Sequence, residues 1–164
     1  MLWLAKLPAV TRERGGMITA GNAPGLNDGA AAVVLMSGTR AQERGATPLA
    51  RVVAYATGGG EPKELFFAPI DAVQKLMKKM GVSIGHFDLI EANEAFAAQA
   101  LGWDWSRVNV NGGAVALGHP IGASGARVLV TLLHALEQRG LRTGLATLCL
   151  GGGNAVALAV ERVA

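Results

Sequence analysis

One segment constrains the fold of this chain more than any other: residues 124–139, which have the pattern of a helix ended by Gly140. Its apolar residues wrap more than one face of that helix; they are Val128, Leu129, Val130, Leu132, Leu133, Ala135 and Leu136. A sheet covers one face of a helix, so this helix must pack between two partners. The sequence therefore predicts a layered structure with residues 124–139 inside it.

Apolar runs alternate with helical patterns along the chain. Strands are predicted for five runs, at residues 30–37, 49–55 (ended by the glycines at 58–60), 87–90, 145–150 and 155–160. Helices are predicted for residues 39–44, for the stretch from Ala68 to its stop at Gly81, and for 93–99. The glycines at 151–153 predict a hairpin or a close pair for the last two strands. This order is typical of an α/β layered sheet with an antiparallel final strand.

Composition excludes several classes of protein. Hydrophobic residues make up 51% of the chain and charged residues 16%, a balance that predicts a packed core rather than disorder. The net charge of +3 comes from dispersed basic residues. The densest run, Lys75, Lys78 and Lys79, lies on an amphipathic helical pattern and is typical of a solvated face. We therefore expect no nucleic-acid partner.

The cysteine count and the apolar runs bear on location. One cysteine allows no intramolecular disulfide, which favours a reducing compartment. No apolar run reaches bilayer length, and Lys6 and Pro8 interrupt the apolar start before a signal-peptide core is complete. We expect a cytoplasmic protein with no membrane partner.

Asn93 follows a predicted strand directly and opens a predicted helix. The ordinary interpretation is an N-cap, in which the side chain accepts a hydrogen bond from the backbone. The functional interpretation is an amide that orients a ligand or a water, because open α/β sheets bind ligands at the carboxyl ends of their strands. Both interpretations stay open for this residue taken alone.

His119 lies in a glycine-rich loop that enters the helix at residues 124–139. No simple packing requirement explains a histidine there, so structural and functional roles both stay open. The helix macrodipole opposes a second proton on an imidazole at a helix N-terminus. A neutral imidazole in this place is suited to act as a base or a hydrogen-bond donor near pH 7.

Cys149 ends a predicted strand and is followed, after Leu150, by three glycines. A lone cysteine in an apolar strand is ordinarily a small core residue. At a strand end, the sulfur would instead face a cavity, and the N–H of Gly151 would donate to a developing oxyanion. The local sequence is compatible with either role.

Other common motifs do not fit. The chain has neither a phosphate loop nor the glycine spacing of a dinucleotide fingerprint. Ser124 stands in a near match to the nucleophile elbow of esterases, but Ala126 occupies the last position and no strand precedes it. The histidines, the cysteine and the acidic residues show no metal-ligand spacing. We expect no bound metal or cofactor.

Three blocks, at residues 93–99, 112–127 and 149–153, resemble the C-terminal half of the thiolase family in their order and spacing. A fourth block, residues 19–31, resembles the family's entry into that half. The resemblance covers nearly the whole chain. It implies a thiolase-like three-layer α/β/α half with a mixed five-stranded sheet.

The resemblance also implies an activity: transfer of acyl groups between coenzyme A thioesters, by Claisen condensation or by thiolytic cleavage of 3-ketoacyl-CoA. By motif, His119 corresponds to the histidine that activates the thiolase nucleophile and contributes to an oxyanion hole. Asn93 corresponds to the asparagine that fixes the water of that hole. Cys149 corresponds to the acid/base cysteine, and the backbone of Gly151 to part of a second oxyanion hole.

The same resemblance assigns Ala95 and Phe96 to substrate binding. It divides the chain into an entry segment at residues 1–28, leading from an N-terminal half, and a C-terminal domain at residues 29–164. Thiolases carry their nucleophilic cysteine in the N-terminal half. Because Cys149 corresponds to the other cysteine, no residue of this sequence corresponds to the nucleophile.

Two smaller departures from the family concern the site. Pro24 stands where many relatives have a serine that contacts the pantetheine arm. The segment between Gln99 and Asn109 is shorter than is usual for the family, which would displace Asn93. A displacement near 1 Å at such a site costs roughly 100-fold in rate.

These expectations leave three hypotheses. The first is an acyltransferase half that needs an N-terminal thiolase half carrying the nucleophile. The second is a non-catalytic thiolase-fold scaffold subunit, and the third is a truncated relic that associates through its apolar helix. An N-terminal half or self-association into a homo-oligomer is the expected partner, with an acyl-CoA as the expected substrate.

Overall fold

The computed structural model describes residues 3, 6–9, 18–25, 27–93 and 102–163. The strands are β1 (Ala50–Gly59), β2 (Leu89–Asn93), β3 (Thr143–Leu150) and β4 (Asn154–Arg162). The α-helices are α1 (Gly38–Glu43), α2 (Ala68–Met80), α4 (Ala114–Leu117) and α5 (Ser124–Gln138). The 3-10 helices are η2 (Pro62–Phe67), η3 (Ile84–His86), η4 (Trp105–Arg107) and η5 (Gly151–Gly153).

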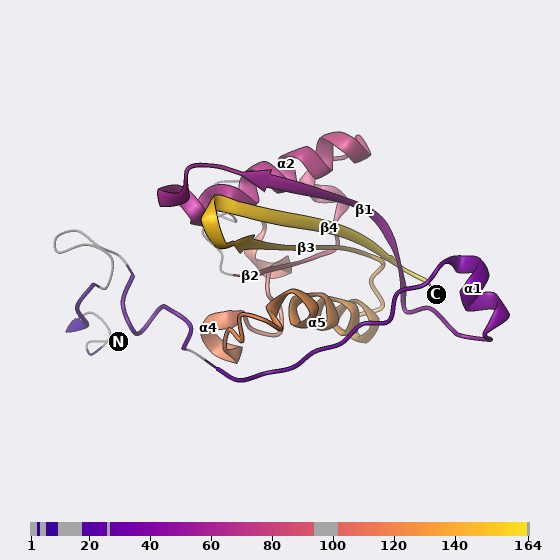
Figure 1. Cartoon of the computed structure of the whole chain (residues 1–164), viewed down its shortest axis with the longest axis horizontal. Helices are drawn as coiled ribbons and strands as arrows, with labels where there is room; N and C mark the ends of the chain where they lie inside the picture. Colours follow the sequence, from indigo (N-terminus) through magenta and orange to yellow (C-terminus); the bar gives the residue numbers. More distant parts are fainter. Residues whose placement is uncertain (1–2, 4–5, 10–17, 26, 94–101, 164) are drawn as a thin grey trace.

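The strands form one mixed sheet in the order β1-β4-β3-β2 (Figure 1). β4 runs antiparallel to both β1 and β3, and β2 runs parallel to β3. The turn between β3 and β4 is η5, so the glycines at 151–153 join two antiparallel neighbours, as predicted. The parallel pair places the carboxyl ends of β2 and β3 at the same edge of the sheet, because Asn93 lies opposite Leu148.

The sheet lies between two helices, α2 on one face and α5 on the other (Figure 1). Alternate residues of β2 face the two helices: Ile90 and Ala92 pack in the core with α2, and Leu89 packs in the core with α5. The three-layer α/β/α arrangement is thus confirmed. None of the helices in the described part of the chain is long and apolar enough to cross a bilayer.

Helix α2 follows its sequence pattern closely. Pro69 lies in the first turn, where a missing N–H costs nothing, and Gly81 ends the helix in the left-handed conformation at φ 67°. Val73 and Leu76 are fully buried against the sheet. The predicted boundaries of this helix are confirmed.

Strand β1 continues through the glycines that were expected to end it, up to Gly59. The reason is close packing against α2: a Cβ on Gly58 would lie 2.4 Å from the backbone nitrogen of Ala72. The absent side chain at Gly58 lets the helix approach the strand, while pairing with β4 runs on to Asn154. Here glycine marks a close contact between layers rather than a turn.

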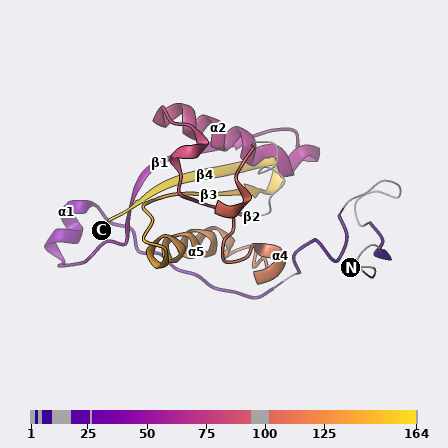
Figure 2. The same cartoon turned by 180° about the vertical axis from the view of Figure 1, so that it is seen from behind.

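The prediction of a five-stranded sheet is wrong, because four strands are found in the described residues. The missing strand is residues 30–37, which belong to an extended segment, residues 27–37, that is unpaired with the sheet. This segment passes along the side of α5 that faces away from the sheet (Figures 1 and 2). With α5 between it and the sheet, its backbone has no strand edge to pair with.

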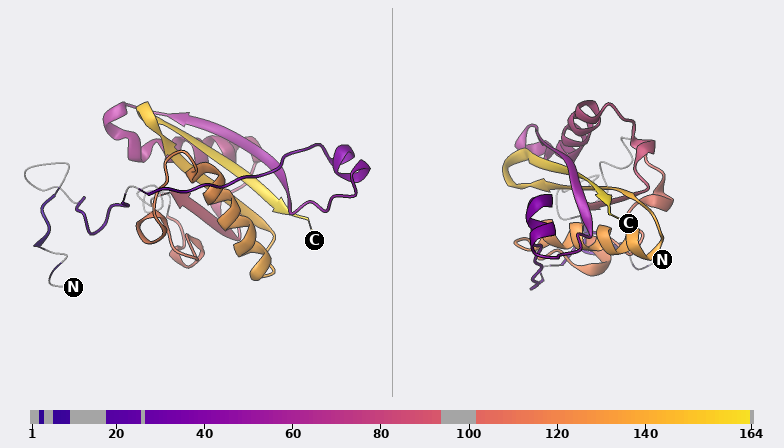
Figure 3. Two further views of the ribbon diagram at one scale, coloured as in Figure 1. Left: turned by 60° about the horizontal axis from the view of Figure 1, so that its bottom comes forward. Right: turned by 90° about the vertical axis from the view of Figure 1, so that its right-hand side faces the viewer.

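The extended segment gives α5 a neighbour on its outer side, in line with the prediction that this helix needs two partners (Figure 3). The extended segment covers this side of α5 only in part, since Leu129, Val130 and Leu133 are half-buried. Of the helix predicted for residues 93–99, Asn93 is the last residue of β2 and residues 94–99 lie outside the described part of the chain.

Candidate active site

His119 lies in the loop between α4 and α5, held against the extended segment. Its backbone N–H donates to the side-chain oxygen of Asn27 at 3.1 Å. Gly118 makes this crossing possible, because its φ is 95° and a Cβ there would lie 2.6 Å from Asn27 Oδ1. The backbone of His119 is thereby held to a segment 92 residues earlier in the chain.

The hydrogen-bond partners of Ser124 favour one tautomer of His119. Its Nδ1 lies 2.6 Å from the hydroxyl of Ser124, the first residue of α5, and that hydroxyl donates to the carbonyl oxygen of Pro120 at 2.9 Å. A hydroxyl has one proton to donate, so Ser124 accepts from His119 and the ring proton sits on Nδ1. The lone pair is then on Nε2, which is the atom available to act as a base.

Asn93 brings its amide beside this ring from the carboxyl end of β2. Its Nδ2 lies 3.4 Å from Nε2 and 3.5 Å from Nδ1 of His119. Nearly equal distances to the two ring nitrogens mean that the amide lies against the ring rather than in line with one lone pair. Its oxygen accepts from Nη2 of Arg127 at 3.1 Å.

Burial and a nearby positive charge both favour the neutral form of His119. Burial lowers the pKa of His119, and the nearby charge of Arg127 lowers it further. The sequence predicts this direction from the helix macrodipole, whereas the structure attributes it first to burial. On the same side of the sheet, burial of Glu91 raises the pKa of its carboxyl to about 7, against the opposing charges of Arg127 and Arg139.

Cys149 and Gly151 lie at the same edge of the sheet as Asn93. Cys149 is half-buried near the end of β3 and pairs with Ala155, whose side chain packs in the core with α2. This register places the cysteine on the α2 face, while Asn93 meets α5. No hydrogen bond between described residues joins Cys149 to His119 or Asn93. Gly151 is exposed, and its carbonyl oxygen accepts from Asn154.

Ala95 and Phe96 lie outside the described residues. The sequence prediction had not assigned Ser124, Arg127, Glu91 or Asn27, all of which contact or electrostatically influence the site. One signal was present: Arg127 stands in the first turn of α5, where a cation is disfavoured by the macrodipole. Nothing in the local sequence predicts the contact of Asn27 with His119, because the two residues lie on segments that are distant in the chain.

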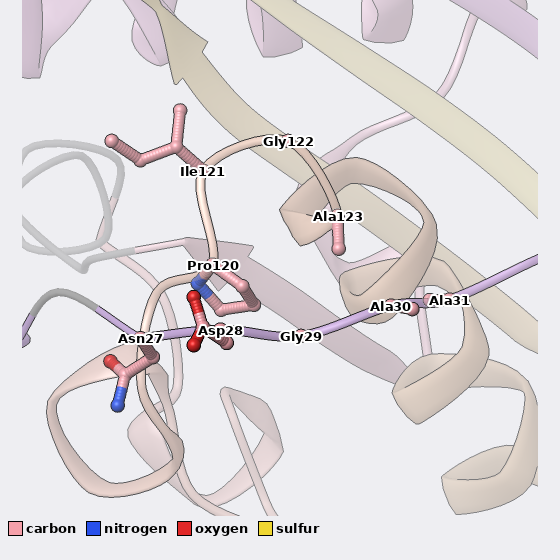
Figure 4. A pocket seen from close by; sticks show the side chains of 9 residues that line it. All are labelled: Asn27, Asp28, Gly29, Ala30, Ala31, Pro120, Ile121, Gly122 and Ala123. Atoms are coloured by element: carbon pink, nitrogen blue, oxygen red, sulfur yellow. The ribbon is translucent and has the colours of Figure 1, made fainter.

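A groove of about 390 Å³ lies between the extended segment and the loop that enters α5, and its lining begins at Pro120, the residue after His119 (Figure 4). Asp28 and Gly29 line one wall, and Pro120 faces them from the other. The side chain of Ile121 projects away from the extended segment and is largely exposed (Figure 4). No cluster of three or more metal-binding side chains occurs among the described residues.

An imidazole with a free Nε2, an adjacent amide and a sheet edge that carries a cysteine together define a candidate acid–base site in an α/β protein. Comparisons with known proteins identify its family. The model of the thiolase C-terminal domain matches residues 46–162, and that of the thiolase N-terminal domain matches residues 3–39. The chain belongs to the thiolase family.

Named relatives agree with this assignment. The chain is 58% identical to an acetyl-CoA acetyltransferase of Allochromatium vinosum over 98% of its own length and 42% of the relative's. It is 55% identical to the acetyl-CoA acetyltransferase of Escherichia coli, covering 92% of this chain and 40% of that one. The chain thus spans about two fifths of the length of these relatives.

Solved structures show the same fold. The crystal structure of the Bacillus anthracis acetyl-CoA acetyltransferase matches with a TM-score of 0.92 at 48% identity, over 99% of this chain and 42% of that one. Human mitochondrial 3-ketoacyl-CoA thiolase matches with a TM-score of 0.89 at 38% identity, over 99% of this chain and 43% of the other.

Proposed function

We propose that this chain provides the C-terminal half of a thiolase-type acyltransferase. The reaction is Claisen condensation of acetyl-CoA or, in reverse, thiolytic cleavage of a 3-ketoacyl-CoA. It takes place in the cytoplasm. The observation that carries the proposal is the 2.6 Å contact between Nδ1 of His119 and the hydroxyl of Ser124, which also bonds the carbonyl oxygen of Pro120; we infer from it a ring proton on Nδ1 and an Nε2 able to accept one. No metal or bound cofactor takes part in this scheme.

In the first half-reaction His119 accepts the proton of a cysteine thiol on the N-terminal half, whose sulfur attacks the thioester carbonyl. The acyl group moves to that sulfur, and coenzyme A leaves as a thiol with a proton returned to it. Once Nε2 of His119 has taken this proton, its N–H and the water fixed by Asn93 stabilise the oxyanion of the thioester. Ala95 and Phe96 bind the substrate in this proposal.

In the second half-reaction Cys149 removes the α-proton of an incoming acetyl-CoA. The resulting carbanion attacks the acyl-enzyme carbonyl, which releases the nucleophilic cysteine and gives 3-ketoacyl-CoA. The backbone N–H of Gly151 donates to the oxyanion formed in this step. Cys149 is suited to the role by its half-buried place near a strand end, beside three glycines that add no side chains.

The nucleophile comes from an N-terminal half, on the same polypeptide or on another. Residues 30–37 support this partner, since they match the model of the N-terminal domain. Their apolar side chains are exposed, Val34 at 84% and Leu35 at 74%. Among the described residues, no backbone hydrogen bond engages residues 28–36. An unpaired, extended and apolar segment is suited to pair with the edge of another sheet.

Two finer points remain part of the proposal. The proposed boundary between the entry segment and the C-terminal domain lies after residue 28, and the match to the N-terminal domain model extends past it to residue 39. A second copy of this chain is the alternative cover for the exposed apolar segment, and it competes with the N-terminal half for the same surface.

Complementation tests the proposal. The purified chain is mixed with the N-terminal half of the Allochromatium vinosum relative, and release of free coenzyme A from acetyl-CoA is measured. We expect release from the mixture and none from either half alone. His119→Ala should abolish it, and Cys149→Ala should limit it to one coenzyme A per site, because Cys149 acts only in the second half-reaction.

His134→Ala is the matched control, because His134 is an exposed histidine on α5 that contacts Glu137. It should leave the rate unchanged. Release by this chain alone would contradict the proposed need for a second half. A stable complex that releases no coenzyme A would instead identify a scaffold subunit.

A further inference from the structure

The side-chain amide of Asn93 has one possible orientation in this structure. Nη2 of Arg127 lies 3.1 Å from its oxygen. A guanidinium has donors and no acceptor, so the oxygen of the amide must face Arg127. The nitrogen of the amide therefore points to the other side, where the ring of His119 lies.

Arg127 stands where a cation is intrinsically unfavourable. It lies in the first turn of α5, which has no acidic residue, and the helix dipole opposes a positive charge there. Its Nε and Nη1 are buried and have no hydrogen-bond partner among the described residues. Burying an incompletely bonded guanidinium costs free energy. Helix stability alone therefore does not explain this side chain.

Glu91 supplies a compensating charge from the sheet. It is 1% exposed and lies two residues before Asn93 on β2, so both side chains face α5. Within the described part of the chain, Glu91 and Arg127 make no direct ion pair, and Oε1 of Glu91 has no hydrogen-bond partner. Above its pKa of about 7 the Glu91 carboxylate balances the guanidinium through space, and no direct ion pair draws Arg127 away from Asn93.

We propose that Arg127 is a positioning residue that sets the orientation of the Asn93 amide beside His119, with Glu91 supporting its charge. This inference rests on the proposed function in one respect, because the amide is useful where an oxyanion forms. Without Arg127, the amide is free to turn its oxygen toward His119. An oxygen there would repel a developing negative charge, so the loss falls on the chemical step more than on substrate binding.

The first test uses the chain alone and needs no acyl transfer. The side-chain amide signals of Asn93 and the pKa of His119 are measured by NMR in the wild-type chain, in Arg127→Met and in Arg139→Met. In Arg127→Met, the Asn93 signals should move toward those of an exposed asparagine, and the pKa of His119 should rise because a nearby positive charge is gone.

Arg139→Met is the matched control. Arg139 also lies near Glu91 and ends α5, but it donates to the carbonyl oxygen of Val110 and to Asn111 rather than to Asn93. It should leave the Asn93 signals and the pKa of His119 at their wild-type values. Equal effects of the two arginine variants would overturn the proposal.

The second test uses the chain assembled with the N-terminal half. Arg127→Met should lower kcat on the order of 10- to 100-fold, with KM for acetyl-CoA changed less than about threefold. Arg127→Lys keeps the charge but carries its donor on a shorter side chain, which moves the donor away from the oxygen of Asn93, so it should restore thermal stability and only part of kcat. A fully active Arg127→Lys would show that charge alone matters and would overturn the positioning role.

The two proposals fail separately. If no assembled form releases coenzyme A, the proposed function fails while the Asn93 signals still decide the role of Arg127. If Arg127→Met leaves those signals and the pKa of His119 unchanged, the positioning role fails whatever the activity. Where Arg127→Met does not fold, the same signals are read in Arg127→Lys, which should shift them because the shorter side chain moves the donor away from the oxygen of Asn93.

Discussion

The hydroxyl of Ser124 lies 2.6 Å from Nδ1 of His119 and gives its own proton to the carbonyl oxygen of Pro120. His119 and Pro120 belong to the loop that enters α5 and Ser124 is the first residue of that helix, so a short stretch of backbone favours one tautomer of the candidate base. The partners outside this loop, Asn93 and Arg127, then act on a ring whose basic nitrogen is already defined.

Ser124→Ala should release this tautomer. Nδ1 of His119 and the carbonyl of Pro120 each lose a partner, and Ser124 is fully buried, so we expect a loss of about 1–3 kcal/mol in unfolding free energy. Imidazole ¹⁵N shifts should show a mixture of tautomers, and coenzyme A release in the assembled form should fall about tenfold or more. Ser83→Ala, at an N-cap where the side chain makes no capping bond, should change neither.

Gly118 and Gly125 form a matched pair of glycines near the site. Gly118→Ala places a methyl group 2.6 Å from Asn27 Oδ1 at φ 95°, so it should destabilise the chain by about 1–3 kcal/mol or more and detach Asn27 from the loop. Gly125 lies in α5 with open space at its Cβ, and Gly125→Ala should stabilise by about 0.5–1 kcal/mol. Urea denaturation of both variants measures the difference, and equal effects would contradict the close crossing at Gly118.

Glu91 should make stability fall as the pH rises. Its folded pKa of about 7 lies above its ordinary value of 4.5, so between these values the folded state holds a proton that the unfolded state has released. The contribution is therefore complete below pH 4.5 and is lost as the pH approaches 7. Its size is roughly 3 kcal/mol, since one pKa unit corresponds to about 1.4 kcal/mol.

Glu91→Gln isolates this effect, because Gln has nearly the same shape and does not titrate. The free energy of unfolding of the wild type minus that of the variant should decrease from pH 5 to pH 8 in urea titrations. Other groups titrate alike in both chains and cancel. A difference that stays constant over this range would show that the Glu91 carboxyl is ionised in the folded state throughout.

Val34→Pro should block assembly with the N-terminal half. Proline removes a backbone donor and constrains the preceding residue, so pairing with another sheet edge is lost. We expect affinity to fall at least about tenfold in sedimentation or calorimetry, with the fold of the chain unchanged because Val34 is 84% exposed. Val34→Thr keeps the donor and the β-branched shape and should assemble normally. Equal affinities of the two variants would remove residues 30–37 from the interface.

The sequence predicted the elements whose causes are local. Helix α2 begins at Ala68 and ends at Gly81 because an early proline and a left-handed glycine define its ends whatever surrounds it. The hairpin of β3 and β4 follows from three glycines between two apolar runs. His119, Asn93 and Cys149 could be selected as candidates because each breaks the apolar or glycine pattern around it.

Predictions from the local sequence pattern were wrong where contacts between distant segments decide the secondary structure. Residues 30–37 have the composition of a strand, but a strand needs a neighbour, and the sheet of this chain lies on the other side of α5. The glycines at 58–60 have the composition of a turn, yet Gly58 lies within β1 because α2 packs closely over it. Neither result is encoded within a few residues of the position concerned.

The sequence by itself therefore determined the layered α/β class, the boundaries of α2 and the residue types able to carry acid–base chemistry. Tertiary structure alone decided that Ser124 fixes the tautomer of His119, that Arg127 orients Asn93, and that Asn27 holds the loop from 92 residues away. The physical reason is the separation along the chain of the residues that interact. Helix ends and turns follow from dihedral preferences of neighbouring residues, whereas hydrogen bonds between β2, α5 and the extended segment exist only once the layers have packed.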